Sequence, residues 1–162
     1  MNPALLFGWL AARSIARGLP APVTDHGGFR VDTGGEVEIR RWAFSELCSG
    51  LTELGRTLDA PGHLLKLCGS GGDLLAALPP RGRLHAPAYF MDGPAVPPPP
   101  VTLPPDYALQ LGRDAGVSRV TILALDGSLA ASGTASEAAD VFIYDQIITS
   151  PEHRRKGVGR AV

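Results

Sequence analysis

The chain has 162 residues, of which 44% are hydrophobic and 19% are charged, and its formal net charge is -1. This length and composition allow one domain with its own core, or one domain with a smaller appendage. The small net charge excludes a general electrostatic attraction to nucleic acid or to an anionic membrane, so we expect neither as a partner. Two cysteines form no disulfide framework, and His63 has no companion ligands, so we expect no metal site.

The first segment predicts an amphipathic helix. Leu5, Leu6, Trp9 and Leu10 recur at helical spacing, and Gly18 is expected to end the helix. The positive charges of this segment follow its apolar run, which is not the order of a signal peptide. No apolar run approaches the length of a membrane span, and we expect a cytoplasmic location.

A hairpin, a helix and a short strand are predicted next. Residues 27–33 and 36–42 alternate as two strands joined by Gly34-Gly35. Residues 47–58 carry helical spacing, and residues 63–68 form a strand-like run.

A glycine-rich loop follows at residues 69–73. Between a strand and a helix, it resembles the first motif of class I methyltransferases, which bind S-adenosylmethionine. However, Lys66 stands where that family usually has an acidic residue, and Leu74 stands where a dinucleotide loop has its third glycine. The alternative, which we favour, is a tight turn in which Asp73 caps a helix over residues 74–78.

A proline-rich segment divides the chain. Residues 94–105 contain seven prolines, which favour an extended connector and cannot join a central sheet. The sequence therefore predicts an N-terminal α/β region over residues 1–93, a linker over 94–105 and a second region over 106–162.

The second region predicts a series of strands. Four strand-like runs occupy residues 107–111, 119–125, 129–134 and 141–150. Asp126-Gly127 predicts a turn between the second and third, and Pro151 stops the last strand from continuing.

A basic glycine loop follows the last strand, with the sequence Arg154-Arg155-Lys156-Gly157-Val158-Gly159-Arg160. Glycines let the backbone approach a ligand closely, and free N–H groups at a helix start suit a phosphate. The loop lacks the Gly-Lys-Ser/Thr end of a Walker loop. Ala161 stands where a dinucleotide fingerprint has its third glycine. The loop therefore predicts a phosphate or pyrophosphate site of another kind.

The spacing Arg154-x-x-Gly157-x-Gly159 resembles the coenzyme A pyrophosphate loop of the GNAT superfamily of N-acetyltransferases. The approach Pro151-Glu152-His153-Arg154-Arg155 and the preceding strands are also similar to that family, over residues 106–162. The resemblance implies an α/β fold with a mixed, mainly antiparallel sheet flanked by helices, the GNAT-like acyl-CoA N-acyltransferase fold. It also implies further strands and helices after Val162, so we expect the C-terminal part of that fold to be absent and the 162-residue chain to be inactive. By analogy, residues 1–93 are a candidate degenerate half of the same architecture.

The resemblance implies transfer of an acetyl group from acetyl-CoA to an amine. The coenzyme A pyrophosphate would lie on the loop, whose cofactor-binding residues are then Arg154, Arg155, Lys156, Gly157, Val158, Gly159 and Arg160. The pantetheine arm would pair with the exposed edge of the last strand. A backbone N–H of Ile148 or Thr149 would polarise the thioester carbonyl.

Two ionisable side chains of the last strand, Tyr144 and Asp145, are the catalytic candidates. Because successive strand residues face opposite sides, at most one of them faces the cleft. A base must remove a proton from the amine, often through water, and Asp145 is the candidate base. A solvated carboxylate at a strand end is the alternative. We expect His153 to be a solvent-exposed residue of the loop.

Other function classes fit parts of the sequence. A coenzyme A-binding pseudo-enzyme or interaction module would keep the loop without acceptor chemistry, and a methyltransferase fragment would bind its cofactor at residues 69–73. The expected partners are a small-molecule or peptide amine acceptor and, through an open sheet edge, a second copy in a homodimer.

Overall fold

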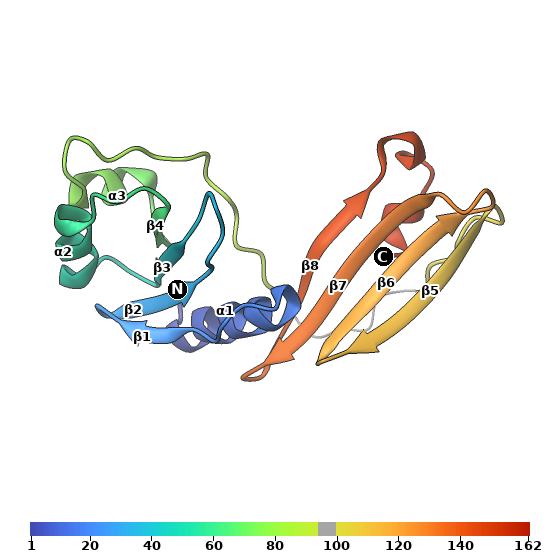
Figure 1. Cartoon of the computed structure of the whole chain (residues 1–162), viewed down its shortest axis with the longest axis horizontal. Helices are drawn as coiled ribbons and strands as arrows, with labels where there is room; N and C mark the ends of the chain where they lie inside the picture. Colours follow the sequence, from blue (N-terminus) through green and yellow to red (C-terminus); the bar gives the residue numbers. More distant parts are fainter. Residues whose placement is uncertain (94–99) are drawn as a thin grey trace.

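A computed structural model describes residues 1–93 and 100–162 of the chain. Two four-stranded sheets lie side by side, with helices on the first, and they form a mixed α/β architecture (Figure 1). The predicted α/β class and mainly antiparallel pairing are confirmed. The strands form two separate sheets, one before and one after the predicted linker, and β4 and β5 do not pair with each other.

The first sheet contains β1 (Val23–Asp25), β2 (Gly28–Asp32), β3 (Arg40–Phe44) and β4 (His63–Leu67), in that order. The first two pairings are antiparallel, and β3 and β4 are parallel. The predicted hairpin is confirmed in its pairing, but its second strand begins at Arg40 instead of Glu36. Thr33 and Gly34 both donate backbone hydrogen bonds to Ile39, which closes a longer connection than a two-glycine turn.

Three α-helices occur in the described residues, α1 over Pro3–Arg17, α2 over Ser49–Thr57 and α3 over Gly71–Ala77. The Asn2 side chain caps α1 by accepting from the Ala4 N–H, and Gly18 ends it in the left-handed region at φ 62°. The predicted first helix is therefore confirmed. The expected cap of α3 is wrong, because Ser70 caps the helix by accepting from the Asp73 N–H, and Asp73 lies within the first turn.

The second sheet is an antiparallel meander of β5 (Tyr107–Asp114), β6 (Val117–Ala124), β7 (Leu129–Ala138) and β8 (Val141–Thr149). All four predicted strands are confirmed, in the predicted order. Of the predicted linker, residues 94–99 lie outside the described residues, and residues 100–105 contain neither helix nor strand.

Helix α1 packs against both sheets (Figure 1). On one side Leu6 and Leu10 form a buried cluster with Val31 and Ala43 of the first sheet. Large side chains fill this contact, which gives the first sheet its core on the α1 face. The opposite face of the same sheet is covered by α2 and α3, whose contacts with it include Leu51 and Leu54.

The other side of α1 carries small residues that allow close approach to the second sheet. Ala12 and Ala16 are buried against Ile143 of β8. The Ser136 hydroxyl of β7 donates a 2.6 Å hydrogen bond to the backbone carbonyl of Ala12. A Cβ atom at Gly8 would lie 2.4 Å from a methyl group of Val141, so only glycine fits there without movement.

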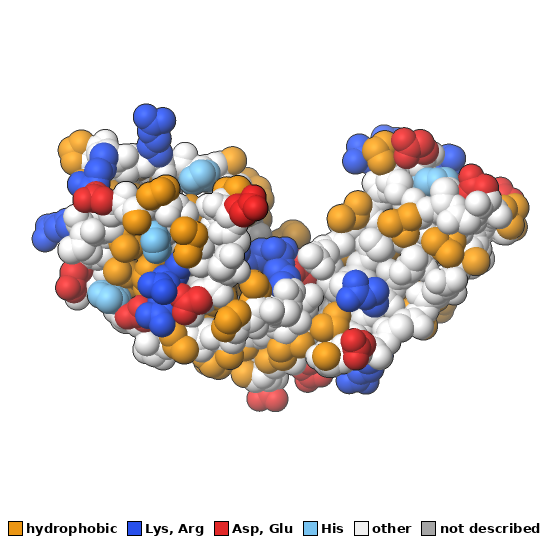
Figure 2. All heavy atoms as spheres, in the orientation of Figure 1, with side chains coloured by type: hydrophobic (Ala, Val, Ile, Leu, Met, Phe, Trp, Pro, Cys, Tyr) orange, Lys and Arg blue, Asp and Glu red, His pale blue; other side chains and the backbone are white. Residues whose placement is uncertain are grey.

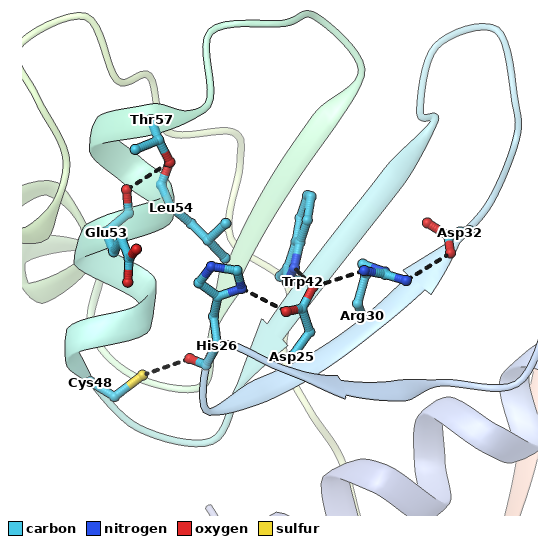
Figure 3. Close-up of polar contacts among 9 residues, drawn as sticks. All are labelled: Asp25, His26, Arg30, Asp32, Trp42, Cys48, Glu53, Leu54 and Thr57. Carbon is cyan, nitrogen blue, oxygen red and sulfur yellow. Dashed lines mark hydrogen bonds and ion pairs between the residues drawn. The ribbon is translucent and has the colours of Figure 1, made fainter.

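A carboxylate on the first sheet joins the β1–β2 hairpin to β3 (Figure 3). Asp25 accepts a 2.9 Å hydrogen bond from the Trp42 indole N–H and a 3.0 Å bond from Arg30, and it lies 2.6 Å from Nδ1 of His26. Burial alone would raise the pKa of Asp25, but the bonds from Trp42, His26 and Arg30 together lower it below its ordinary value. Asp25 thus holds β1, β2 and β3 together, and this structural role accounts for the network.

The close approach of α1 to the second sheet can be tested at Gly8. Replacing Gly8 with Leu should lower the free energy of unfolding in urea by about 1–3 kcal/mol, because the side chain must displace Val141 or move the helix. The control is Gly112→Leu, at a position where a Cβ atom meets nothing within 4 Å. Equal effects of the two changes would contradict the packing of α1 on the second sheet.

Candidate functional site

The basic loop after β8 consists of two short 3₁₀ turns, over Pro151–His153 and Val158–Arg160. Gly157 lies between them at φ 84°, a left-handed conformation that favours glycine. Arg155 also has positive φ, at 63°. The helix start expected here is present as a single 3₁₀ turn.

A pocket of about 310 Å³ lies against this loop. It is lined by Thr149, His153, Arg154, Arg155, Gly157, Gly159 and Arg160. The structure therefore brings together most of the residues predicted to bind a cofactor. Among the others, Lys156 and Ile148 are exposed to solvent and Val158 is buried.

Free hydrogen-bond donors are concentrated in the loop. In the described parts of the chain, the backbone N–H groups of residues 155–159 donate to no acceptor. The turn bonds of the loop involve other donors, including those of Arg154 and Arg160. Consecutive free N–H groups beside basic side chains provide the chemistry of an oxyanion site.

Two contacts hold the loop against the end of the second sheet. Val158 is completely buried in a cluster with Ile122, Ala130 and Ala131. A Cβ atom at Gly159 would lie 2.9 Å from Oγ1 of Thr149, so the loop backbone is tightly packed against β8. Of the predicted cofactor residues, Val158 has no exposed surface, so it anchors the loop in the core and offers a ligand neither its side chain nor its backbone.

His153 is half-buried and hydrogen-bonded, so the expectation of a solvent-exposed side chain is wrong. Its Nδ1 lies 3.1 Å from the Tyr107 hydroxyl, and its Nε2 lies 3.4 Å from the Ser128 hydroxyl. Ser128 in turn donates a 2.6 Å bond to Asp126. These contacts join the loop to β5 and to the β6–β7 turn. Sequence reasoning missed them, although Asp126-Gly127-Ser128 is a turn sequence in which an aspartate accepts from the second residue after it.

Strand β8 contains a bulge immediately before the predicted thioester-binding residues. Asp145 pairs with Thr134 and Ile148 pairs with Ser132, so two residues of β8 face the single intervening residue of β7. Gln146, within the bulge, has φ 55°. Bulges locally disrupt the ladder and re-aim side chains. Because β8 is also an edge strand, its outer row of backbone groups is open beside Ile148 and Thr149.

The two catalytic candidates point to opposite faces of β8, as predicted. Asp145 faces α1, where Arg17 donates two hydrogen bonds to its carboxylate, and 13% of its side chain is exposed. Tyr144 lies on the other face, where it is exposed and its ring meets that of Phe142. The hydrogen bond from Arg17 lowers the pKa of Asp145 below its ordinary value, and burial opposes that shift only in part. Protonation of Asp145 would break this pair, which opposes its use as a base.

The glycine-rich loop of residues 69–73 is accounted for by the start of α3. None of its glycines has positive φ, and the Ser70 hydroxyl is used as the helix cap. The helix predicted over residues 74–78 is present, but it begins at Gly71, so residues 71–73 belong to its first turn instead of a preceding tight turn.

The remaining potential sites can be described briefly. Within residues 1–93 and 100–162, no three histidine, cysteine or acidic side chains are grouped to hold a metal ion. Cys48 and Cys68 are free thiols. No helix in this described part of the chain has both the length and the apolarity needed to cross a membrane.

No protein-family model, no curated protein and no solved structure matches this chain. An assignment of function therefore depends on the residues and geometry of the loop and of β8.

The ion pair on β8 predicts a specific titration. The pKa of Asp145, followed by carboxyl-carbon NMR, should lie below its ordinary value and should rise in Arg17→Gln, because the variant loses both hydrogen bonds. Since the folded pKa lies below the unfolded one, the pair stabilises the fold above pH about 4, and this contribution is lost as the pH falls through the folded pKa. Arg113→Gln, which removes a cation outside this contact, should leave the titration unchanged. An Asp145 pKa above its ordinary value would contradict the pair and would favour a proton-accepting role.

Proposed function

We propose that this chain carries the cofactor-binding elements of a GNAT-like N-acetyltransferase and that its loop of residues 154–160 binds the pyrophosphate of acetyl-CoA. The observation that carries the proposal is the set of free and exposed N–H groups of Arg155, Lys156, Gly157 and Gly159, in a basic loop directly after an edge strand. A pyrophosphate needs several donors on a short arc of backbone, and positive charge beside them. Arg154, Arg155 and Arg160 line the pocket and supply that charge.

The path of the remaining cofactor follows from the open edge of β8. The pantetheine arm carries amide groups, which can pair with the outer backbone groups of that strand. The bulge at Gln146 disturbs the ladder next to Ile148 and Thr149, and Thr149 lines the loop pocket. In this proposal a backbone N–H of Ile148 or Thr149 donates to the thioester carbonyl oxygen, where negative charge develops.

The proposed reaction is aminolysis of a thioester. The neutral amine attacks the acetyl carbonyl carbon, a C–N bond forms, the C–S bond breaks and coenzyme A leaves as a thiolate, which takes up a proton. The proton lost by the amine goes to a base, directly or through water. Asp145 stays the candidate base, with Tyr144 as the other ionisable side chain of the strand. For Asp145 to accept a proton, its pair with Arg17 must open.

A second candidate function is favoured by that same ion pair. A coenzyme A-binding module without acyl transfer needs the loop and the edge of β8, but it needs no base. With both oxygens of Asp145 bonded to Arg17, β8 offers such a module its cofactor contacts and no free carboxylate. Binding of acetyl-CoA without an acetylated product from any tested amine would favour this candidate over the enzyme.

Acetyl-CoA should raise the thermal midpoint of the chain, and S-adenosylmethionine should not. A ligand present at about 100 times its dissociation constant stabilises the folded state by about 2.7 kcal/mol. Gly157→Val should abolish the shift, because the side chain blocks the approach of the phosphates.

The control is Gly34→Val, which also places a side chain at positive φ in open space, but in the connection between β2 and β3. The backbone strain that valine causes at positive φ is then similar in the two variants. Only Gly157→Val should lose the response to acetyl-CoA. If the response survives in Gly157→Val, the pyrophosphate assignment is wrong. A response to S-adenosylmethionine alone would instead favour the methyltransferase interpretation of residues 69–73.

A further inference from the structure

Basic side chains gather in the hollow between the two sheets (Figure 2). Arg13 and Arg17 lie one turn apart on α1, so they share a face of the helix. Lys66 comes from β4, where it pairs in register with Ala43. Because Ala43 packs against α1 and directly paired residues face the same side of a sheet, Lys66 lies on the face that α1 covers.

The cluster contains more positive than negative charge. Arg17 pairs with Asp145 of β8, and Arg41 pairs with Glu38. Arg13 and Lys66 form no ion pair or hydrogen bond with any side chain in the described residues. Residues 94–99 contain no acidic side chain that could supply one.

Of the two cations without partners, Arg13 is half-buried and Lys66 is exposed. Partial desolvation lowers the pKa of Lys66, and the charges of Arg13 and Arg17 lower it further, against the opposing charge of Glu38. Burial likewise lowers the pKa of Arg13, and Arg17 adds to the effect, while the charges of Asp145 and Glu38 oppose it. The guanidinium of Arg13 also stacks over the ring of Trp9 at 5.3 Å, which limits its freedom to turn out to solvent. Mutual repulsion of this kind is relieved by a bound anion.

We propose that Arg13 and Lys66 bind an oxyanion, the carboxylate or phosphate group of a small molecule, in the hollow between α1, β4 and β8. Asp145 and Glu38 border the site, where they form ion pairs with Arg17 and Arg41. Arg13 and Lys66 are therefore available to a ligand. The site is separate from the loop pocket, whose lining residues include none of Arg13, Lys66 and Asp145. It does not depend on the assignment of coenzyme A to the loop.

The test is the thermal midpoint of the whole chain with citrate or inorganic phosphate, against sodium chloride at equal ionic strength. Wild type should gain about 2–4 °C near saturation. Lys66→Gln and Arg13→Gln should lose this gain. Without the anion, Lys66→Gln should melt no lower than wild type, because it removes a like-charge repulsion from an exposed side chain. A larger gain with citrate assigns a carboxylate to the site, and a larger gain with phosphate assigns a phosphate.

Two matched variants separate the cluster from other basic surfaces, since each also removes one positive charge. Arg113→Gln alters an exposed position on β5 and Arg119→Gln alters an exposed position on β6, and both should keep the full gain. Equal gains in all variants would mean an adventitious ion only and would overturn the proposal. A gain lost only in Arg155→Gln, a variant of the loop, would assign the anion to the loop and would equally overturn it.

Discussion

The position of α1 between the two sheets is the constraint on which the rest of the structure depends. Its leucines fill the core of the first sheet, and its glycine and alanines allow the second sheet to come close. At its C-terminal end, Arg17 bonds to Asp145 across a separation of 128 residues. One helix therefore supplies apolar packing to both sheets and a polar contact to the strand that carries the candidate site.

Strand β8 connects the candidate loop with this helix. Its buried side, Ile143 and Asp145, is held by α1, while its outer edge is open and ends at the basic loop. The loop is fixed in turn by Val158 in the core and by the contacts of His153. Free backbone donors are thus presented on a firmly held turn, which is what binding of a charged group requires, because no donor has to be ordered at the time of binding.

Local patterns in the sequence were enough to predict α1 and the four strands of the second sheet. Helical spacing ending at Gly18 and alternating runs bounded by turns are signals contained within a few neighbouring residues. The basic loop was also predictable, because its chemistry depends on consecutive residues. The packing of α1 on both sheets, the bulge at Gln146 and the pair between Arg17 and Asp145 were not predictable from such patterns. Each of these features depends on contacts between segments that are distant in the sequence, and such contacts carry no local signature. The pair with Arg17 occupies the carboxylate of Asp145, which the sequence alone presented as a free base.

Hydrogen exchange of the backbone amides, with and without acetyl-CoA, tests the central claim most directly. The claim is that β8 and α1 form a stable support and that the loop donors are free until a ligand binds. The account predicts slow exchange in α1 and β7 without ligand, and slowing by acetyl-CoA at residues 155–159 but not at residues 69–73. Protection confined to residues 69–73, or no change at residues 155–159 at saturating acetyl-CoA, would contradict it.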